Sequence, residues 1–271
     1  MGRVGAAVKE LARRGGKLAF AAADVAYGAV PGPRILIYHQ IDAGLGRQME
    51  VTRDAFVAQL EWMQAHGDVV SLEQAILRRA EPGADRLFVI TFDDGYDDFY
   101  RLGFPELERR GLPFVLYLTT HPVESGEPLK DGGGAEPLTW GQVDKMAASG
   151  LMTLGAHTHH HLDFRSISTA QVVDELDSSN ELIERRMGVT PQHFAYPWGY
   201  WSEQGADAVA SRYATATLGS GAAVTADRDL LLLNRIPVQL SDGVYFFTRK
   251  MRSGMRLEDV VRRRLTGYTG P

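Results

Sequence analysis

Short apolar runs rich in β-branched residues alternate with segments of helical periodicity from residue 35 onward, and this alternation restricts the fold more than any other feature. The runs predict strands at Ile35–Tyr38, Asp68–Val70, Leu87–Phe92, Phe114–Leu118, Leu151–Leu154, His193–Tyr196, Ala214–Thr217 and Leu231–Val238. Several are apolar at nearly every position, as is typical of parallel strands buried on both faces. Strands that alternate with helices indicate parallel βα units. About seven or eight parallel strands favour a distorted (β/α) barrel in a single domain over an open sheet.

The helices between these strands have recognisable ends. Thr52 is placed to cap a helix that presents Phe56, Leu60 and Met63 on one face and ends at Gly67. Two capping-box patterns, in which Ser or Thr precedes Gln by three positions, predict two more helix starts. These are Thr139 with Gln142, ending at Gly150, and Ser168 with Gln171, ending at Gly188. Further helices are expected at Phe104–Arg110 and Glu203–Ser211, and a long surface loop at Glu124–Pro137.

The composition excludes several classes of protein. Of the 271 residues, 44% are hydrophobic and 23% are charged, which is ordinary for a globular domain. The formal net charge of -5 lacks the basic excess expected of a nucleic-acid-binding protein. No cysteine is present, so disulfides and thiolate metal sites are excluded and any metal must use histidine and carboxylate ligands.

We expect three segments: an N-terminal arm or helix at residues 1–34, the barrel at 35–240 and a basic C-terminal segment at 241–271. Basic residues before the apolar stretch Leu18–Val30 resemble a signal peptide, but Asp24 interrupts that stretch and it is too short to span a bilayer. The sequence therefore favours a cytoplasmic protein. Its basic ends, including Arg249–Arg264, either contact an anionic membrane peripherally or pack as solvated ends on the domain. The oligomeric state cannot be predicted from the sequence.

The first polar motif, Thr91-Phe92-Asp93-Asp94-Gly95-Tyr96, follows an apolar run and so puts two carboxylates at the C-terminal end of a strand. Neighbours on a regular strand point to opposite faces, but the turn that Gly95 permits lets both side chains reach one cavity. Two close carboxylates repel each other unless a cation or a proton lies between them. Taken alone, the motif also fits a polar turn with solvated acids.

Four of the eight histidines lie between His157 and His161, directly after the predicted strand Leu151–Leu154. His157 and His161 are four positions apart, a spacing that lets two imidazoles meet one metal ion on a helical turn or in a tight loop. His159 and His160 are assigned no role and are expected to face solvent or pack locally. The alternative is a histidine-rich polar loop without a metal.

Two further clusters end predicted strands. Phe194-Ala195-Tyr196-Pro197-Trp198-Gly199 combines a fixed bend with aromatic rings of the kind that cover the apolar faces of sugars. Tyr38-His39 closes the first predicted strand. Each cluster alone is equally typical of structural residues. However, the C-terminal ends of βα-barrel strands converge on one face, where active sites are built, so the four clusters together favour one site.

These motifs resemble those of the polysaccharide deacetylases, the NodB-homology domains of carbohydrate esterase family four, over residues 35–240. Thr91–Tyr96 resembles the T-F-D-D-G motif, His157–His161 the H-[ST]-x-x-H motif, and Phe194–Gly199 a variant of the R-P-P-Y-G motif. The resemblance implies metal-dependent hydrolysis of N-acetyl groups on a glycan or amino-sugar conjugate.

Residue by residue, the resemblance implies that Asp93 is the catalytic base and that Asp94, His157 and His161 are the metal ligands. It also implies that the backbone N–H of Trp198 binds the oxyanion, with Tyr196 beside it in the substrate cleft.

The sequence departs from the family pattern in two places. Ala195 stands where many members carry an arginine that orients the base, and Arg235 is expected to supply that guanidinium from a neighbouring strand. The late L-x-H motif that provides the acid is missing, since no histidine follows His193. Tyr38-His39-Gln40-Ile41 resembles the corresponding element of the permuted branch that includes the poly-N-acetylglucosamine deacetylases, which implies His39 as the acid.

The expected cofactor is one divalent metal, with zinc first and cobalt, nickel or iron compatible with the same ligands. Three other functions remain open. Two histidines and one carboxylate also describe non-haem iron oxygenases, although those need no second acid beside the ligand. A catalytically silent glycan-binding homologue and an O-acetyl esterase are compatible with the same fold.

Overall fold

The structure is a computed structural model that describes residues 16–18, 31–130, 132–253, 258, 260–261 and 264. Most of the predicted arm at residues 1–34, including Asp24, and most of residues 254–271 lie outside these ranges. Membrane contact through the basic ends therefore stays a prediction. In the described part of the chain, no helix has both the length and the apolar character that crossing a bilayer requires.

An eight-stranded parallel sheet forms the centre of the protein, in the order β10-β1-β5-β6-β7-β8-β9 with β4 added beside β5. A separate two-stranded sheet pairs β2 with β3. The strands are β1 (Arg34–Tyr38), β2 (Gln40–Ile41), β3 (Glu50–Val51), β4 (Asp68–Val69), β5 (Leu87–Asp94), β6 (Phe114–Leu118), β7 (Met152–Ala156), β8 (His193–Ala195), β9 (Thr215–Thr217) and β10 (Ile236–Pro237).

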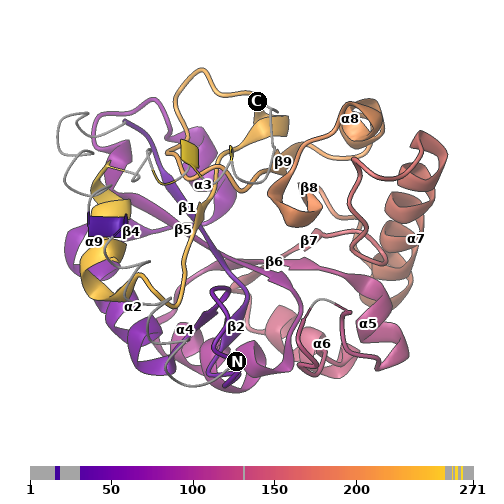
Figure 1. The fold of residues 1–271 in the computed structure, drawn as a ribbon, viewed down its shortest axis with the longest axis horizontal. Coiled ribbons are helices and arrows are strands. Elements are labelled where there is room, and N and C mark those ends of the chain that lie inside the picture. Colours follow the sequence, from indigo (N-terminus) through magenta and orange to yellow (C-terminus); the bar gives the residue numbers. More distant parts are fainter. Residues whose placement is uncertain are drawn as a thin grey trace.

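Helices surround this sheet, which curves into a half-barrel (Figure 1). They are α2 (Arg53–His66), α3 (Leu72–Leu77), α4 (Phe104–Arg110), α5 (Thr120–Ser125), α6 (Trp140–Ala148), α7 (Thr169–Met187), α8 (Glu203–Ala210) and α9 (Gly243–Ser253). Short helical turns occupy Ala84–Arg86, Phe99–Gly103, Pro197–Gly199 and Leu230–Leu232. Leu36 of β1 pairs with Ile236 of β10, so the first strand lies beside the last. The predicted α/β barrel-like fold in one domain is confirmed.

The helix ends follow the capping chemistry predicted from the sequence. The Thr52 side chain accepts a hydrogen bond from the backbone N–H of Ala55, and both predicted capping boxes are formed. Gly188 ends α7 in the left-handed conformation, which a glycine adopts without steric cost. Helix α6 ends at Ala148, and Gly150 follows in the left-handed conformation as the predicted stop, whereas the loop predicted from Glu124 begins inside α5.

The predicted strand Leu231–Val238 is wrong over most of its length. Residues Leu230–Leu232 form a helical turn, and only Ile236–Pro237 pair as a strand. Leu233 bridges to Thr217 of β9, whereas Ile236 pairs with β1, so the segment passes from one strand to another. Pro237 cannot donate a backbone hydrogen bond, which limits the pairing further. Apolar composition alone could not distinguish this crossing from a continuous strand.

Alternation along β5 divides the core into two layers and positions the site. Phe88, Ile90 and Phe92 face a layer that includes Tyr38 and Phe56 of α2. The rings of Tyr38 and Phe92 are stacked, with centroids 5.3 Å apart. Leu87 and Val89 face a second layer on the other side of the sheet. Because side chains alternate along a strand, Asp93 points to the same side as Val89, toward the inside of the half-barrel.

Candidate active site

The two adjacent carboxylates reach one cavity because the backbone leaves the strand conformation at the second of them. Asp93 still belongs to the inward-facing series of β5, whereas Asp94 has a φ of 72° and Gly95 a φ of 93°. A Cβ at Gly95 would lie 2.6 Å from a methyl carbon of Leu118, so the turn requires glycine both for its φ and for space. Both aspartates are buried and line the same cavity.

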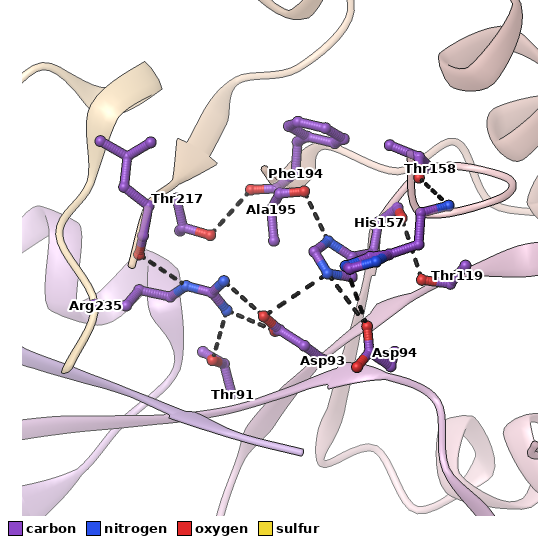
Figure 2. A network of polar contacts seen from close by, with 12 residues as sticks. Thr91, Asp93, Asp94, Thr119, His157, Thr158, Phe194, Ala195, Thr217 and Arg235 are labelled. Carbon is purple, nitrogen blue, oxygen red and sulfur yellow. Dashed lines mark hydrogen bonds and ion pairs between the residues drawn. The ribbon is translucent and has the colours of Figure 1, made fainter. Parts of the chain in front are cut away.

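The two histidines predicted as ligands approach the same point from the loop after β7. The Nε2 atoms of His157 and His161 each lie 3.5 Å from Oδ1 of Asp94. The imidazole of His157 donates from Nδ1 to the carbonyl oxygen of Ala195 at 2.8 Å, which leaves the lone pair of Nε2 facing Asp94 (Figure 2). Thr158 and His161 both have positive φ, so the four-residue spacing is accommodated by a tight loop and not by a helix.

This donor set fits a divalent metal ion. Oδ1 of Asp94 is buried and has no hydrogen-bond partner among the described residues, which is costly unless something else satisfies it. One ligand atom from each of Asp94, His157 and His161 lies within 4.8 Å of the other two. Tetrahedral zinc with bonds of about 2.0–2.1 Å holds its ligand atoms about 3.3 Å apart, close to the 3.5 Å seen here. Burial lowers the pKa of His157 to about 4, so its imidazole is neutral, the form that binds metals.

The carboxylate of Asp93 is held by Arg235, the arginine that was expected to orient it. Arg235 donates from its two terminal nitrogens to Oδ1 and Oδ2 of Asp93, at 2.6 and 2.7 Å (Figure 2). The same side chain also donates to the hydroxyl of Thr91 and lies over the ring of Tyr117. Burial alone would raise the pKa of Asp93, but Arg235 and His157 stabilise the ionised form and lower that pKa to about 2.

His39 lines the same cavity from the end of β1, as the sequence predicted for this strand end. Its Nδ1 atom is buried and has no hydrogen-bond partner among the described residues. Its imidazole is therefore not committed to a structural hydrogen bond. The pairing of β1 with β10 and β5 brings His39, Arg235 and Asp93 to one cavity from three neighbouring strands or their ends.

The two aromatic residues predicted for the cleft lie in different places. Trp198 lines the cavity with a φ of 62°, is 45% exposed, and has its ring 5.3 Å from that of His161. Tyr196 is 1% exposed, packs against Phe164 and Phe194 in the core, and is not among the residues that line the cavity. The bend at Pro197 turns the chain between them, so one aromatic is buried while the other faces the cleft.

Several residues that line the cavity were not predicted, among them Arg47, Met49, Tyr96, Leu129 and Gln239. Arg47 and Met49 come from the connection between β2 and β3, which has no motif that could have identified them. Burial and the neighbouring Asp94 raise the pKa of Tyr96, so its phenol stays neutral. A second cavity adjoins the first and shares Leu129, His161 and Trp198 with it.

Comparison with known proteins gives a consistent set of similarities. The polysaccharide deacetylase family model matches residues 80–215, a range that contains Asp93, Asp94, His157 and His161. The YxkH protein of Bacillus subtilis is 24% identical over 208 residues, which are 75% of this chain and 70% of that protein. The poly-beta-1,6-N-acetyl-D-glucosamine N-deacetylase of Escherichia coli is 30% identical over 137 residues, 47% of this chain and only 20% of that enzyme.

Solved structures agree with this result. The Streptococcus pyogenes deacetylase PplD, described in complex with acetate, superimposes with a TM-score of 0.69 at 25% identity. The match covers 82% of this chain and 99% of that one. The curved parallel sheet described above is therefore the fold of a solved deacetylase.

Proposed function

The chain belongs to the polysaccharide deacetylase family, and we propose that it hydrolyses N-acetyl groups on a glycan or amino-sugar conjugate with the help of one divalent metal ion. The observation that carries this proposal is the buried, unpartnered Oδ1 of Asp94, which lies 3.5 Å from one nitrogen of each of His157 and His161. The N-acetyl linkage is favoured by the name of the Escherichia coli relative, an N-deacetylase.

We propose that Asp94, His157 and His161 hold the metal, with zinc the first choice and cobalt, nickel or iron compatible with the same donors. When bound, the ion supplies Lewis acidity toward the acetyl carbonyl and toward the attacking water. The remaining steps belong to side chains and backbone groups of this chain.

Asp93 is proposed as the general base that takes a proton from the attacking water. Arg235 holds both of its oxygens in fixed positions, and the low pKa keeps the carboxylate ionised at neutral pH. General-base catalysis of this kind contributes about 10²–10⁴-fold to the rate. A hydrolase needs a general base such as Asp93 beside the ligand carboxylate of Asp94, whereas a non-haem iron oxygenase does not. The pair of acids therefore favours hydrolysis over oxygenation.

His39 is proposed as the general acid that donates a proton to the leaving nitrogen. An amine leaves poorly without that proton, so the acid matters more for an amide than for an ester. The backbone N–H of Trp198 is proposed to stabilise the oxyanion, because its residue lines the cavity next to His161. The exposed ring of Trp198 offers an apolar surface to a pyranose ring.

An O-acetyl esterase is the second candidate, because the same site can attack an acetyl ester. A direct test is acetate release from matched N-acetylated and O-acetylated sugars and from oligomers of N-acetylglucosamine. Each assay is run with the native protein, after chelation, and after Zn²⁺ is restored. We expect release from the N-acetylated substrates that disappears on chelation and returns with the metal. Release from esters alone would favour the esterase, and release that survives metal removal would exclude the proposed chemistry.

Variants of two buried acids sharpen this test. Asp93→Asn should keep the metal but lose turnover, because the amide fits the site without accepting a proton. Asp98→Asn is the matched control, since Asp98 is a buried acid that accepts a hydrogen bond from Ile41 outside the cavity. A protein that binds metal and glycan but releases no acetate from any substrate would indicate the catalytically silent alternative.

A further inference from the structure

A second group of three histidines lies beside the candidate active site and is used by none of the steps above. His121 belongs to α5, whereas His159 and His160 lie in the loop after β7. One ligand nitrogen from each of the three lies within 4.8 Å of the other two. The ring centroids are 4.6 Å apart for His121 and His160, and 4.3 Å apart for His159 and His160. The three imidazoles therefore form a compact set of donors.

The backbone holds the two segments together. The N–H of His121 donates to the carbonyl oxygen of His159 at 2.9 Å, and the N–H of Thr120 donates to that of Thr158 at 3.2 Å. Strands β6 and β7 are neighbours in the sheet, so the segments that follow them meet at the same edge. The donors come from fixed backbone and not from two independent loops.

Hydrogen bonds orient two of the rings. Nδ1 of His160 lies 2.7 Å from Oε1 of Glu175, and Nδ1 of His159 lies 2.8 Å from the hydroxyl of Thr120. Because the Glu175 carboxylate accepts, His160 carries its proton on Nδ1 and keeps the lone pair of Nε2 free. Metal-binding histidines almost always have such a partner on the second nitrogen. The ring of His121 has no hydrogen-bond partner among the described residues.

Glu175 also contributes negative charge and rigidity. It is buried, and its Oε2 accepts hydrogen bonds from the backbone N–H groups of His159 and His160 at 3.1 and 2.7 Å. One carboxylate of α7 thus fixes both the backbone and one side chain of the cluster. A divalent ion bound by three neutral imidazoles would be partly compensated by this charge.

We propose that His121, His159 and His160 form a second binding site for a divalent transition metal, distinct from the one at Asp94, His157 and His161. Imidazole donors favour Zn²⁺, Co²⁺, Ni²⁺ and Cu²⁺ over Mg²⁺ and Ca²⁺. Tetrahedral zinc would draw the nitrogens to about 3.3 Å from one another, so the rings must close by at most about 1.5 Å. Glu175 and Thr120 hold the rings of His160 and His159, so most of that movement falls to the His121 ring, which makes no hydrogen bond among the described residues.

An ion bound at this site would hold the loop after β7 against α5. His159 and His160 lie between His157 and His161 in the sequence, so an ion bound there connects the loop that carries both candidate ligands to α5. The inference concerns metal binding alone and holds whether or not the proposed deacetylation is correct.

The test is the number of Zn²⁺ ions that the metal-stripped protein of residues 1–271 retains after equilibrium dialysis against buffered free Zn²⁺. We expect two for the wild type, one for His121→Ala, one for His160→Ala and one for Asp94→Asn. The combined variant Asp94→Asn/His121→Ala should retain none. His66→Ala is the matched control and should retain two, because His66 lies on α2, stacked on Trp62 and bonded to its carbonyl. A His121→Ala variant that retains as many ions as the wild type would overturn the proposal, whereas a wild type with one ion that His121→Ala loses would support this site and contradict the one at Asp94, His157 and His161.

Two further measurements separate a lost ligand from a misfolded protein. In the Asp94→Asn background, the electron paramagnetic resonance spectrum of bound Cu²⁺ should show superhyperfine coupling to three nitrogens. His160→Ala should reduce the number of coupled nitrogens to two. Zn²⁺ should raise the Tm of Asp94→Asn but not that of Asp94→Asn/His121→Ala. Glu175→Gln should weaken the second site by about 10–100-fold through loss of ring orientation. A copper spectrum or Tm shift that is unchanged by removal of His121 and His160 would place the ion elsewhere.

Discussion

Arg235 donates a pair of parallel hydrogen bonds to the carboxylate of Asp93, a residue 142 positions earlier in the chain. Both side chains are buried, and the contact links the segment before β10 to the end of β5 (Figure 2). A planar guanidinium fixes both oxygens of a carboxylate at once, which an ammonium group cannot do. Ala195 of β8 occupies the position at which the resemblance implies an arginine in many family members, and Arg235 supplies the guanidinium in its place.

The first prediction concerns Arg235→Lys, which keeps a positive charge but loses the two-point contact. We expect acetate release to fall by about 10²-fold, the scale on which small misplacements reduce rates. Metal binding should be retained. Because the guanidinium lowers the pKa of Asp93, its loss should raise that pKa, and the acid limb of the kcat profile should move to higher pH. The measurement is kcat across pH, with dialysed metal content.

Arg34→Lys is the matched control, since Arg34 is a buried arginine that bonds to backbone carbonyls away from the cavity. It should lower stability without moving the pH profile. Equal effects of the two substitutions on the profile would contradict a specific role for Arg235.

The second prediction concerns His39→Gln. If His39 protonates the leaving group, the loss should be larger for an N-acetyl substrate than for an O-acetyl substrate, because an amine is the poorer leaving group. The informative quantity is the ratio of kcat/KM values for matched amide and ester substrates, which should fall by about 10-fold or more within the range of general-acid effects. His66→Gln should leave this ratio unchanged. A ratio that His39→Gln does not alter would assign the proton to another group.

The third prediction compares two glycines of nearly equal φ. Gly199 has a φ of 72°, and a Cβ there would lie 2.6 Å from the backbone nitrogen of Gly219. Gly188 has a φ of 68° and open space around it. Gly188→Ala should cost only about 1–2 kcal/mol of backbone strain. Gly199→Ala should cost more and displace Trp198, with loss of activity. Denaturant unfolding measures both, and equal losses would show that the contact with Gly219 relaxes freely.

The fourth prediction concerns the pH dependence of stability at Glu106. Hydrogen bonds from Arg109 and Arg110 lower the pKa of this buried carboxyl to about 2, below the ordinary value of 4.5. Its stabilisation is therefore complete above pH 4.5 and is lost as the pH falls toward 2. Glu106→Gln should reduce the free energy of unfolding at pH 7 by about 1–2 kcal/mol, and this difference should vanish near pH 2.

The exposed pair of Glu81 with Arg78 provides the control. Exposed ion pairs contribute little, so Glu81→Gln should change the free energy of unfolding by less than about 1 kcal/mol at any pH. A Glu106→Gln difference that persists unchanged at low pH would mean that packing, and not charge, carries the effect.

Much of the fold was predictable from local sequence because its causes are local. Buried parallel strands need continuous apolar runs, and Phe114–Leu118 is both the predicted and the observed strand. Helix starts depend on a side chain three residues from a backbone N–H, so Thr139 and Ser168 could be recognised directly. The four residues of the two strongest motifs, Asp93, Asp94, His157 and His161, were predicted to meet because strand ends converge in this class of fold.

Other features depend on contacts that no local pattern contains. Tyr196 and Trp198 belong to one motif, but a bend at Pro197 sends the first ring into the core and leaves the second in the cleft. The apolar composition of Leu231–Val238 predicts a strand, but its pairing partner changes from β9 to β1 along its length. His121 had no assigned role, although its place three residues after β6 could have associated it with the loop after β7.

The sequence by itself determined most strands of the central sheet, the starts of the capped helices, and which polar groups stand at strand ends, because these depend on neighbours within a few positions. The sequence indicated Arg235 as the partner of Asp93 through the family resemblance, but only the tertiary structure decided that both terminal nitrogens of Arg235 reach that carboxylate and that His121 meets His159 and His160. Such contacts depend on the order and register of the strands, which are set by packing over the whole half-barrel. A shift of one residue in a strand would turn these side chains to the opposite face.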